Sequence, residues 1–114
     1  MAKTYKPYPQ DTCPLLYTLN QIGQKWKIPI LWHLADEKRP VRYNEFKKLM
    51  PSITGTMLTK SLRELEESGL ILRKAYDFFP LKVEYTLSEK GKTLVPILYD
   101  LHNWGIQNKI NSNE

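Results

Sequence analysis

Residues 52–71 constrain the fold more than any other part of the chain. At about 100° per residue, three leucines fall on one face of a helix: Leu58, Leu62 and Leu65. Gly69 follows as a helix stop, and an apolar segment typical of a strand begins directly after it. The pattern predicts a helix over residues 54–68 that packs on a core through its leucine face and leads at once into a sheet.

The opposite face of this helix carries hydroxyls and cations in its first half. Opposite the leucines lie Thr56, Lys60, Arg63 and Glu67, and Thr59 lies on the flank. The acids gather at the far end, whereas the helix dipole favours acids near the start and cations near the end. The reversed order suits a polyanion at the N-terminal end, as in a helix that enters the major groove of DNA. Charge placement alone is equally compatible with an ordinary amphipathic surface helix.

The net charge of +5 permits a nucleic acid or an anionic membrane as partner. No run approaches the ~18 apolar residues of a membrane span, and the first residues do not form a signal peptide, so we expect a cytoplasmic protein. A single cysteine excludes an internal disulfide framework. The two histidines are isolated, and phosphate-binding and nucleophile motifs are absent. We therefore expect no metal, no cofactor and no enzymatic activity.

The remaining segments predict short helices around one hairpin, mainly α with a small β-hairpin wing. In chain order we expect an arm at residues 1–12, helices over 14–22, 26–35, 43–50 and 54–68, strands over 70–76 and 81–87, a last helix capped by Ser88, and a very short strand at Val41. Pro96 should bend the last helix, and a polar tail should occupy residues 108–114. We therefore expect residues 13–107 to form one winged helix-turn-helix domain, with the first and last helices as the dimerisation helices for the reasons given below.

The sequence also resembles the HxlR-type regulators of bacteria, relatives of the MarR-type repressors. The matching words, in family order, are Cys-Pro at 13–14, IGQKW at 22–26, RYNEF at 42–46, LRELEESGLI at 62–71, VEYTL at 83–87, and Gly91 with LVP at 94–96 and Trp104. They cover roughly residues 13–105. Gln24 stands where the family often has a second glycine, and residues 78–82 replace an arginine- or proline-rich wing tip.

The expected DNA contacts come from three places. The resemblance implies backbone contacts from the start of the third helix, although Tyr43 in the core beside a solvated Arg42 is the alternative. Hydroxyls before the fourth helix suit phosphate contact, and Arg63 can serve a guanine edge or a phosphate. Hairpin cations suit phosphates beside the minor groove, or deter edge pairing. The full set is Arg42, Tyr43, Ser52, Thr54, Thr56, Met57, Thr59, Lys60, Arg63, Arg73, Lys74 and Lys82.

The first and last helices carry more apolar surface than a small domain covers from within, and such surface marks a partner site. The resemblance implies a homodimer in which these helices of two chains interleave and the two copies read half-sites ~34 Å apart. The expected interface residues are Leu15, Leu16, Leu98, Leu101 and Trp104. Phe78 and Phe79 at the hairpin tip either fold back on the domain, pack on a partner subunit or enter DNA.

Cys13 is a candidate redox sensor. It stands at the start of a helix, which favours the thiolate, and Lys6 favours it too, whereas Asp11 opposes it. The resemblance implies sensing of electrophiles or oxidants at this place in some members; an inert thiol is the alternative. We expect a cytoplasmic homodimer that binds double-stranded DNA as a repressor. The rival function is a winged-helix module that binds protein instead of DNA.

Overall fold

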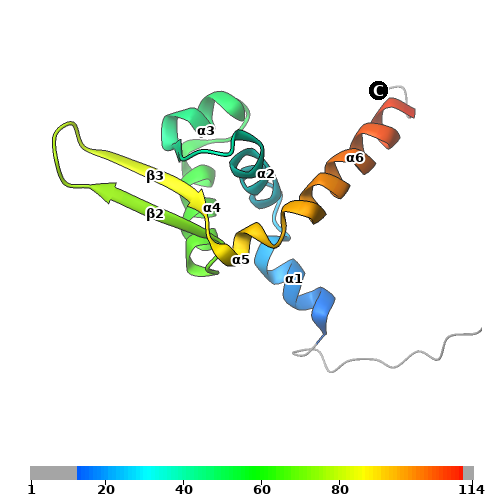
Figure 1. Cartoon of the computed structure of the whole chain (residues 1–114). Helices are drawn as coiled ribbons and strands as arrows, with labels where there is room; N and C mark the ends of the chain where they lie inside the picture. The colour runs from blue at the N-terminus through cyan, green and yellow to red at the C-terminus, as the bar shows by residue number, and fades with distance from the viewer. Residues whose placement is uncertain (1–12, 112–114) are drawn as a thin grey trace, which may run out of the picture.

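The computed structural model describes residues 13–111, so the expected arm at residues 1–12 lies outside the described residues. In chain order the elements are α1 (Pro14–Ile22), α2 (Lys27–Glu37), β1 (Val41–Arg42), α3 (Tyr43–Leu49), α4 (Gly55–Glu67), β2 (Ile71–Tyr76), β3 (Lys82–Leu87), α5 (Glu89–Lys92) and α6 (Val95–Asn111). Helices α2, α3 and α4 form the body, from which the β2–β3 hairpin, α1 and α6 project (Figure 1). This is the winged helix-turn-helix fold that the sequence predicts.

The sheet has three antiparallel strands in the order β1-β3-β2. The two residues of β1 pair with the middle of β3, Val41 opposite Tyr85 and Arg42 opposite Glu84. The pairing of β2 with β3 runs from Ile71 opposite Leu87 to Tyr76 opposite Lys82. The outer half of the hairpin is therefore a two-stranded ribbon, which extends beyond the helical body as the wing (Figure 1).

The core lies where α2, α3, α4 and the inner end of the sheet meet. The leucine face of α4 is buried there as predicted, with Leu58, Leu62 and Leu65 almost inaccessible to solvent. They pack in one cluster with the apolar residues of the neighbouring elements, which include Ile30, Leu31, Leu34, Val41, Phe46, Ile71 and Tyr85. Because this cluster fixes the phase of α4, its opposite face is turned to solvent.

Both ends of α4 are fixed by local hydrogen bonds. The Thr54 hydroxyl accepts a hydrogen bond from the Met57 N–H over 3.1 Å, which caps the free amides of the first turn. At the other end Gly69 has a φ of +76°, in the left-handed region that glycine adopts at low cost. The Leu70 N–H then donates back to the Leu65 carbonyl over 3.0 Å, which closes the helix. The stop predicted at Gly69 is confirmed.

The last helical segment differs from the prediction of one bent helix. Ser88 does cap it, since its hydroxyl accepts from the Gly91 N–H, but the helix ends at Lys92 and α6 starts anew at Val95. Pro96 has no N–H to continue the ladder, so it is tolerated only in the first turn of a new helix. Helix α6 then continues to Asn111, and the segment expected as a polar tail from residue 108 is helical as far as it is described.

Candidate nucleic-acid interface

The first half of the outer face of α4 presents hydroxyls and cations, and the acid of this face, Glu67, lies at the end of the helix. Thr56, Thr59, Lys60 and Arg63 are exposed, and the first turn of the helix holds no acidic residue. Within residues 13–111, no carboxylate lies at ion-pair distance from Lys60 or Arg63. These four side chains line one open hollow of about 500 Å³ together with Tyr43 and Gly55. The structure therefore groups the expected α4 residues as a single cationic surface.

Tyr43 connects α3 to this surface. Its hydroxyl donates to the Gly55 carbonyl oxygen over 3.2 Å and lies 3.4 Å from the Thr59 hydroxyl. The ring is half-buried and packs against the core. Tyr43 is thus partly a packing residue, as one of the two alternatives held, while its hydroxyl reaches the start of α4. This contact positions the N-terminal end of α4 relative to α3.

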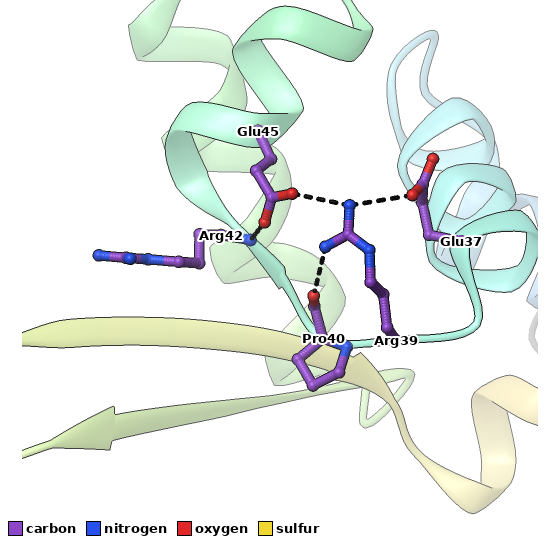
Figure 2. Close-up of polar contacts among 5 residues, drawn as sticks. All are labelled: Glu37, Arg39, Pro40, Arg42 and Glu45. Atoms are coloured by element: carbon purple, nitrogen blue, oxygen red, sulfur yellow. Dashed lines mark hydrogen bonds and ion pairs between the residues drawn. The ribbon is translucent and has the colours of Figure 1, made fainter.

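A network around Arg39 holds the start of α3 in place (Figure 2). Its guanidinium contacts Glu37 Oε1 at 3.0 Å and Glu45 Oε2 at 2.8 Å, and it donates to the Pro40 carbonyl. Glu45 Oε1 in turn accepts from the Arg42 N–H over 3.0 Å. The hydrogen bond from Arg39, followed by that from the Arg42 amide, lowers the pKa of the Glu45 carboxyl.

The Arg42 side chain extends away from this network, and the residue is exposed (Figure 2). The sequence analysis missed the role of Arg39. Glu45 stands three residues after Arg42, the residue that precedes the helix, and this spacing is a known capping signal. It indicates Glu45 but not its partner Arg39. The network is therefore structural, and it leaves the Arg42 guanidinium free to contact a phosphate.

The wing cations lie on two different faces. Arg73 pairs with Tyr85, so by strand alternation it shares the face that packs on α3. Lys74 and Lys82 lie on the other face, with their ammonium groups 4.8 and 4.6 Å from the centre of the Tyr76 ring. The structure therefore does not gather the three expected cations into one patch.

Two of the predicted DNA-contact residues have structural roles instead. Met57 was expected among the DNA contacts, but it is half-buried against the core, because it lies beside the leucine face. The Thr54 hydroxyl is already engaged as the helix cap, whereas Ser52 is exposed in the preceding turn.

At the wing tip the Phe78 ring lies edge-on against Tyr76, with 5.3 Å between ring centres. Phe79 is 94% exposed and does not fold back on the domain.

A buried ion pair, which the sequence analysis did not predict, anchors α4 from behind. The Lys27 ammonium lies 3.2 Å from Glu64 Oε1, and the Lys27 side chain is only 5% exposed. Lys27 stands in an otherwise apolar stretch of α2, and that position was the available sequence signal. The pair connects the start of α2 to the inner flank of α4.

The first and last helices leave a large apolar surface uncovered. We call it the projecting face, formed by Leu15, Leu16, Tyr17 and Leu19 of α1 with Ile97, Leu101, Trp104 and Ile106 of α6, all exposed. Leu98, expected at the same interface, is instead 2% exposed and belongs to the chain's own core. The packing of this end of α6 on the core buries it, so the predicted interface loses this residue.

Cys13 occupies the residue before α1, adjoining the projecting face. It is a free thiol of intermediate exposure, and the Tyr17 N–H donates to its carbonyl oxygen. Lys6 and Asp11, expected to influence it, lie outside the described residues.

In the part of the chain that the structure describes, no helix is long and apolar enough to cross a membrane. No three metal-ligating side chains gather there.

Comparisons with known proteins agree with this geometry. The HxlR-like helix-turn-helix family matches residues 21–113. The chain is 44% identical over 110 residues to the HTH-type transcriptional regulator YybR of Bacillus subtilis, and the aligned region covers 96% of this chain and 86% of YybR. It is 50% identical over 95 residues to YdeP of the same organism, with 83% and 73% covered. These relatives are transcriptional regulators, not enzymes.

Among solved structures, the chain is similar to the redox regulator HypR in its oxidized form. The TM-score is 0.78 at 46% identity, with 83% of this chain and 96% of that chain covered. The reduced form of the transcriptional regulator YodB from B. subtilis gives a TM-score of 0.68 at 30% identity, with 84% and 93% covered. Both structures share the winged helix-turn-helix fold with this chain.

Proposed function

Because the chain belongs to the HxlR-like helix-turn-helix family of transcriptional regulators, we propose that it is a homodimeric repressor that binds a near-palindromic operator. The observation that carries the proposal is the exposed outer face of α4, with Thr56, Thr59, Lys60 and Arg63 and no acid in its first turn. Such a regulator acts in the cytoplasm, where the DNA of a bacterial cell lies.

Helix α4 enters the major groove with its N-terminal end in this proposal. The positive end of the helix dipole and the free backbone amides favour phosphates there. Arg63 donates to a guanine edge in bidentate fashion, or else clamps a phosphate, while Thr56 and Thr59 contact bases or backbone. Tyr43 sets the depth of the helix through Gly55, and Arg42 contacts the neighbouring phosphates.

Two copies of the chain associate through the projecting face. Its eight large apolar side chains are exposed on helices that extend away from the body (Figure 1). Uncovered apolar surface of this kind favours a partner, and a second copy supplies a matching surface by two-fold symmetry. A dimer places two copies of α4 on half-sites ~34 Å apart.

Cys13 is the proposed sensor of this regulator. It adjoins the projecting face, and the similar protein HypR is a redox regulator. The chain has one cysteine, so oxidation ends in a Cys13–Cys13 bond between subunits, a mixed disulfide with a small thiol, or an S-adduct. Any of these shifts α1 at the dimer interface and changes the spacing of the two recognition helices, which forfeits simultaneous binding of both half-sites.

Selection of genomic fragments by the purified protein, followed by footprinting, tests the DNA-binding proposal. We expect a few fragments to be retained at moderate salt, with two protected half-sites about one helical turn apart. Retention that disappears at moderate salt, or that shows no sequence preference, contradicts the proposal. It would favour the rival function, a winged-helix module that binds protein.

Light scattering tests the dimer, and a chain truncated after Tyr99 supplies the comparison. Truncation removes Leu101, Trp104 and Ile106, so we expect aggregation, or a monomer with weak DNA affinity. A well-behaved dimer after truncation places the interface elsewhere.

For the sensor, Cys13→Ser should bind DNA as the parent does and lose the response to diamide or quinones. Non-reducing gels and intact mass identify the product, and unaltered DNA binding of the parent after oxidant treatment contradicts sensing.

A further inference from the structure

The wing tip displays an aromatic side chain that nothing in residues 13–111 covers. Phe79 is 94% exposed, the largest exposed fraction among the large hydrophobic residues of the described part. Its neighbour Phe78 lies edge-on against the Tyr76 ring, which ties the tip to the end of β2. Phe79 is thus held out by an anchored neighbour. Burial of an exposed ring of this size is favourable, so Phe79 is available to a partner that covers it.

The ribbon behind the tip carries cations on both faces. Arg73 lies on the face that packs on α3, and Lys74 and Lys82 lie on the opposite face. The Glu84 carboxylate between them is engaged, since it accepts from the Tyr76 hydroxyl at 2.8 Å and lies 3.6 Å from the Lys82 ammonium. An apolar tip with cationic sides is complementary to a groove with phosphate walls and an apolar floor of stacked bases. A purely apolar protein surface would leave these cations without partners.

The wing is continuous with the outer face of α4. An open hollow of about 790 Å³ runs from Arg42 and Tyr43 to Tyr76, Leu81 and Lys82, and Tyr43 also lines the hollow along α4. The six residues of β2 span ~20 Å at the usual rise of a strand. Adjacent major and minor grooves are ~17 Å apart, half of a helical turn. The ribbon is therefore long enough to reach the minor groove next to the major groove proposed for α4.

We propose that Phe79 enters this minor groove and wedges between two stacked base pairs of the operator, so that the wing selects a deformable step. The inference rests on the proposed DNA binding by α4. Apolar wedges of this kind partly unstack one step and bend the duplex. Pyrimidine–purine steps deform most easily, so such a step belongs beneath the tip.

The first test compares Phe79→Ala with wild type on the duplex that the wild-type protein selects from a randomised pool. Loss of the wedge should weaken binding by about five- to fiftyfold and reduce the bend seen by energy transfer between the duplex ends. Leu72→Ala is the matched control, because Leu72 is another exposed apolar residue of the same ribbon, at its base. It should leave both quantities unchanged. A 2-aminopurine placed at the wedged step should brighten with wild type only.

The second test couples the residue to the DNA. Replacing a TA step beneath the tip by AA should weaken wild type several-fold and leave Phe79→Ala almost unaffected. Asp77→Asn removes the acid next to the tip and should tighten binding, because Asp77 then lies near phosphates.

Sequence-specific binding by Phe79→Ala with an unchanged bend overturns the wedge and leaves the α4 proposal intact. A change of oligomeric state in this variant also overturns it, in favour of a protein partner at the tip. A wild-type protein that selects no DNA sequence overturns both proposals.

Discussion

The Tyr43 hydroxyl donates to the Gly55 carbonyl oxygen over 3.2 Å, which joins the first residue of α3 to the first residue of α4. The same hydroxyl lies 3.4 Å from the Thr59 hydroxyl. The backbone at the start of the proposed recognition helix is therefore positioned by a side chain whose ring is rooted in the core. Core packing and the proposed DNA binding therefore meet in this one residue.

Tyr43→Phe should separate these two roles, because it keeps the ring and removes the hydroxyl. We expect the free energy of unfolding to fall by about 1 kcal/mol, and operator affinity to fall by about two- to tenfold as the start of α4 loosens. Tyr99→Phe, in an exposed tyrosine of α6, is the control and should leave the affinity unchanged. Binding by Tyr43→Phe equal to the parent's would show that the hydroxyl does not position α4.

Removing one partner of the Lys27–Glu64 pair should destabilise the fold. In Glu64→Ala the buried Lys27 ammonium loses its partner, so the free energy of unfolding should fall by about 2–3 kcal/mol, less than for a fully buried pair because Glu64 is partly exposed. The double variant Lys27→Met, Glu64→Ala should recover much of this loss. Denaturant titrations of the single and double variants measure it, and a strictly additive double variant would contradict the coupling.

Leu62→Ala should destabilise the fold by about 2–5 kcal/mol, because Leu62 is buried in the cluster that holds α4. Lys60→Ala, two residues away on the outer face, should stay within about 0.5 kcal/mol of the parent. Thermal and denaturant unfolding compare the two variants. A Leu62→Ala protein as stable as the parent would mean that the phase of α4 is wrong.

Stability should fall in mild acid through His33. Partial burial lowers the pKa of His33, while the neighbouring Glu37 and Asp36 oppose the shift. The unfolded chain therefore takes up the proton at a higher pH than the folded chain does. The contribution is complete above the ordinary histidine pKa of 6.5 and is lost as the pH falls below it. Melting temperatures between about pH 5 and 7 should decline less in His33→Gln, and an identical decline would contradict the assignment.

The parts of the fold that the sequence predicts are those decided by local patterns. The leucine spacing sets the phase of α4, and Gly69 ends it, because only the left-handed backbone region closes the helix there. The grouping of Thr56, Lys60 and Arg63 follows from that phase. The sequence did not predict the break before α6, because the apolar pattern runs through residues 93–94 without interruption. Pro96 has no N–H for the helical hydrogen bonds, and this was the local signal that the helix could not continue.

Contacts between elements could not be predicted in the same way. The Lys27–Glu64 pair and the Arg39–Glu45 pair depend on how helices pack, which no local spacing encodes. Leu98 is as apolar as its exposed neighbours Ile97 and Leu101, and only the packing of α6 on the core buries it. The separation of Arg73 from Lys74 was within reach, because strand alternation alone puts neighbours on opposite faces.

The most direct test of the account is the operator affinity of Arg63→Ala and Lys60→Ala, measured by fluorescence anisotropy beside their thermal stability. Both side chains are exposed and face away from the leucines, so melting should hardly change. Loss of a bidentate base contact should weaken binding by ~1–3 kcal/mol, and loss of a phosphate contact by less. Lys92→Ala removes the same charge from α5 and should bind as the parent does. If Arg63→Ala and Lys60→Ala also bind the operator as tightly as the parent, the outer face of α4 is not the DNA-binding surface.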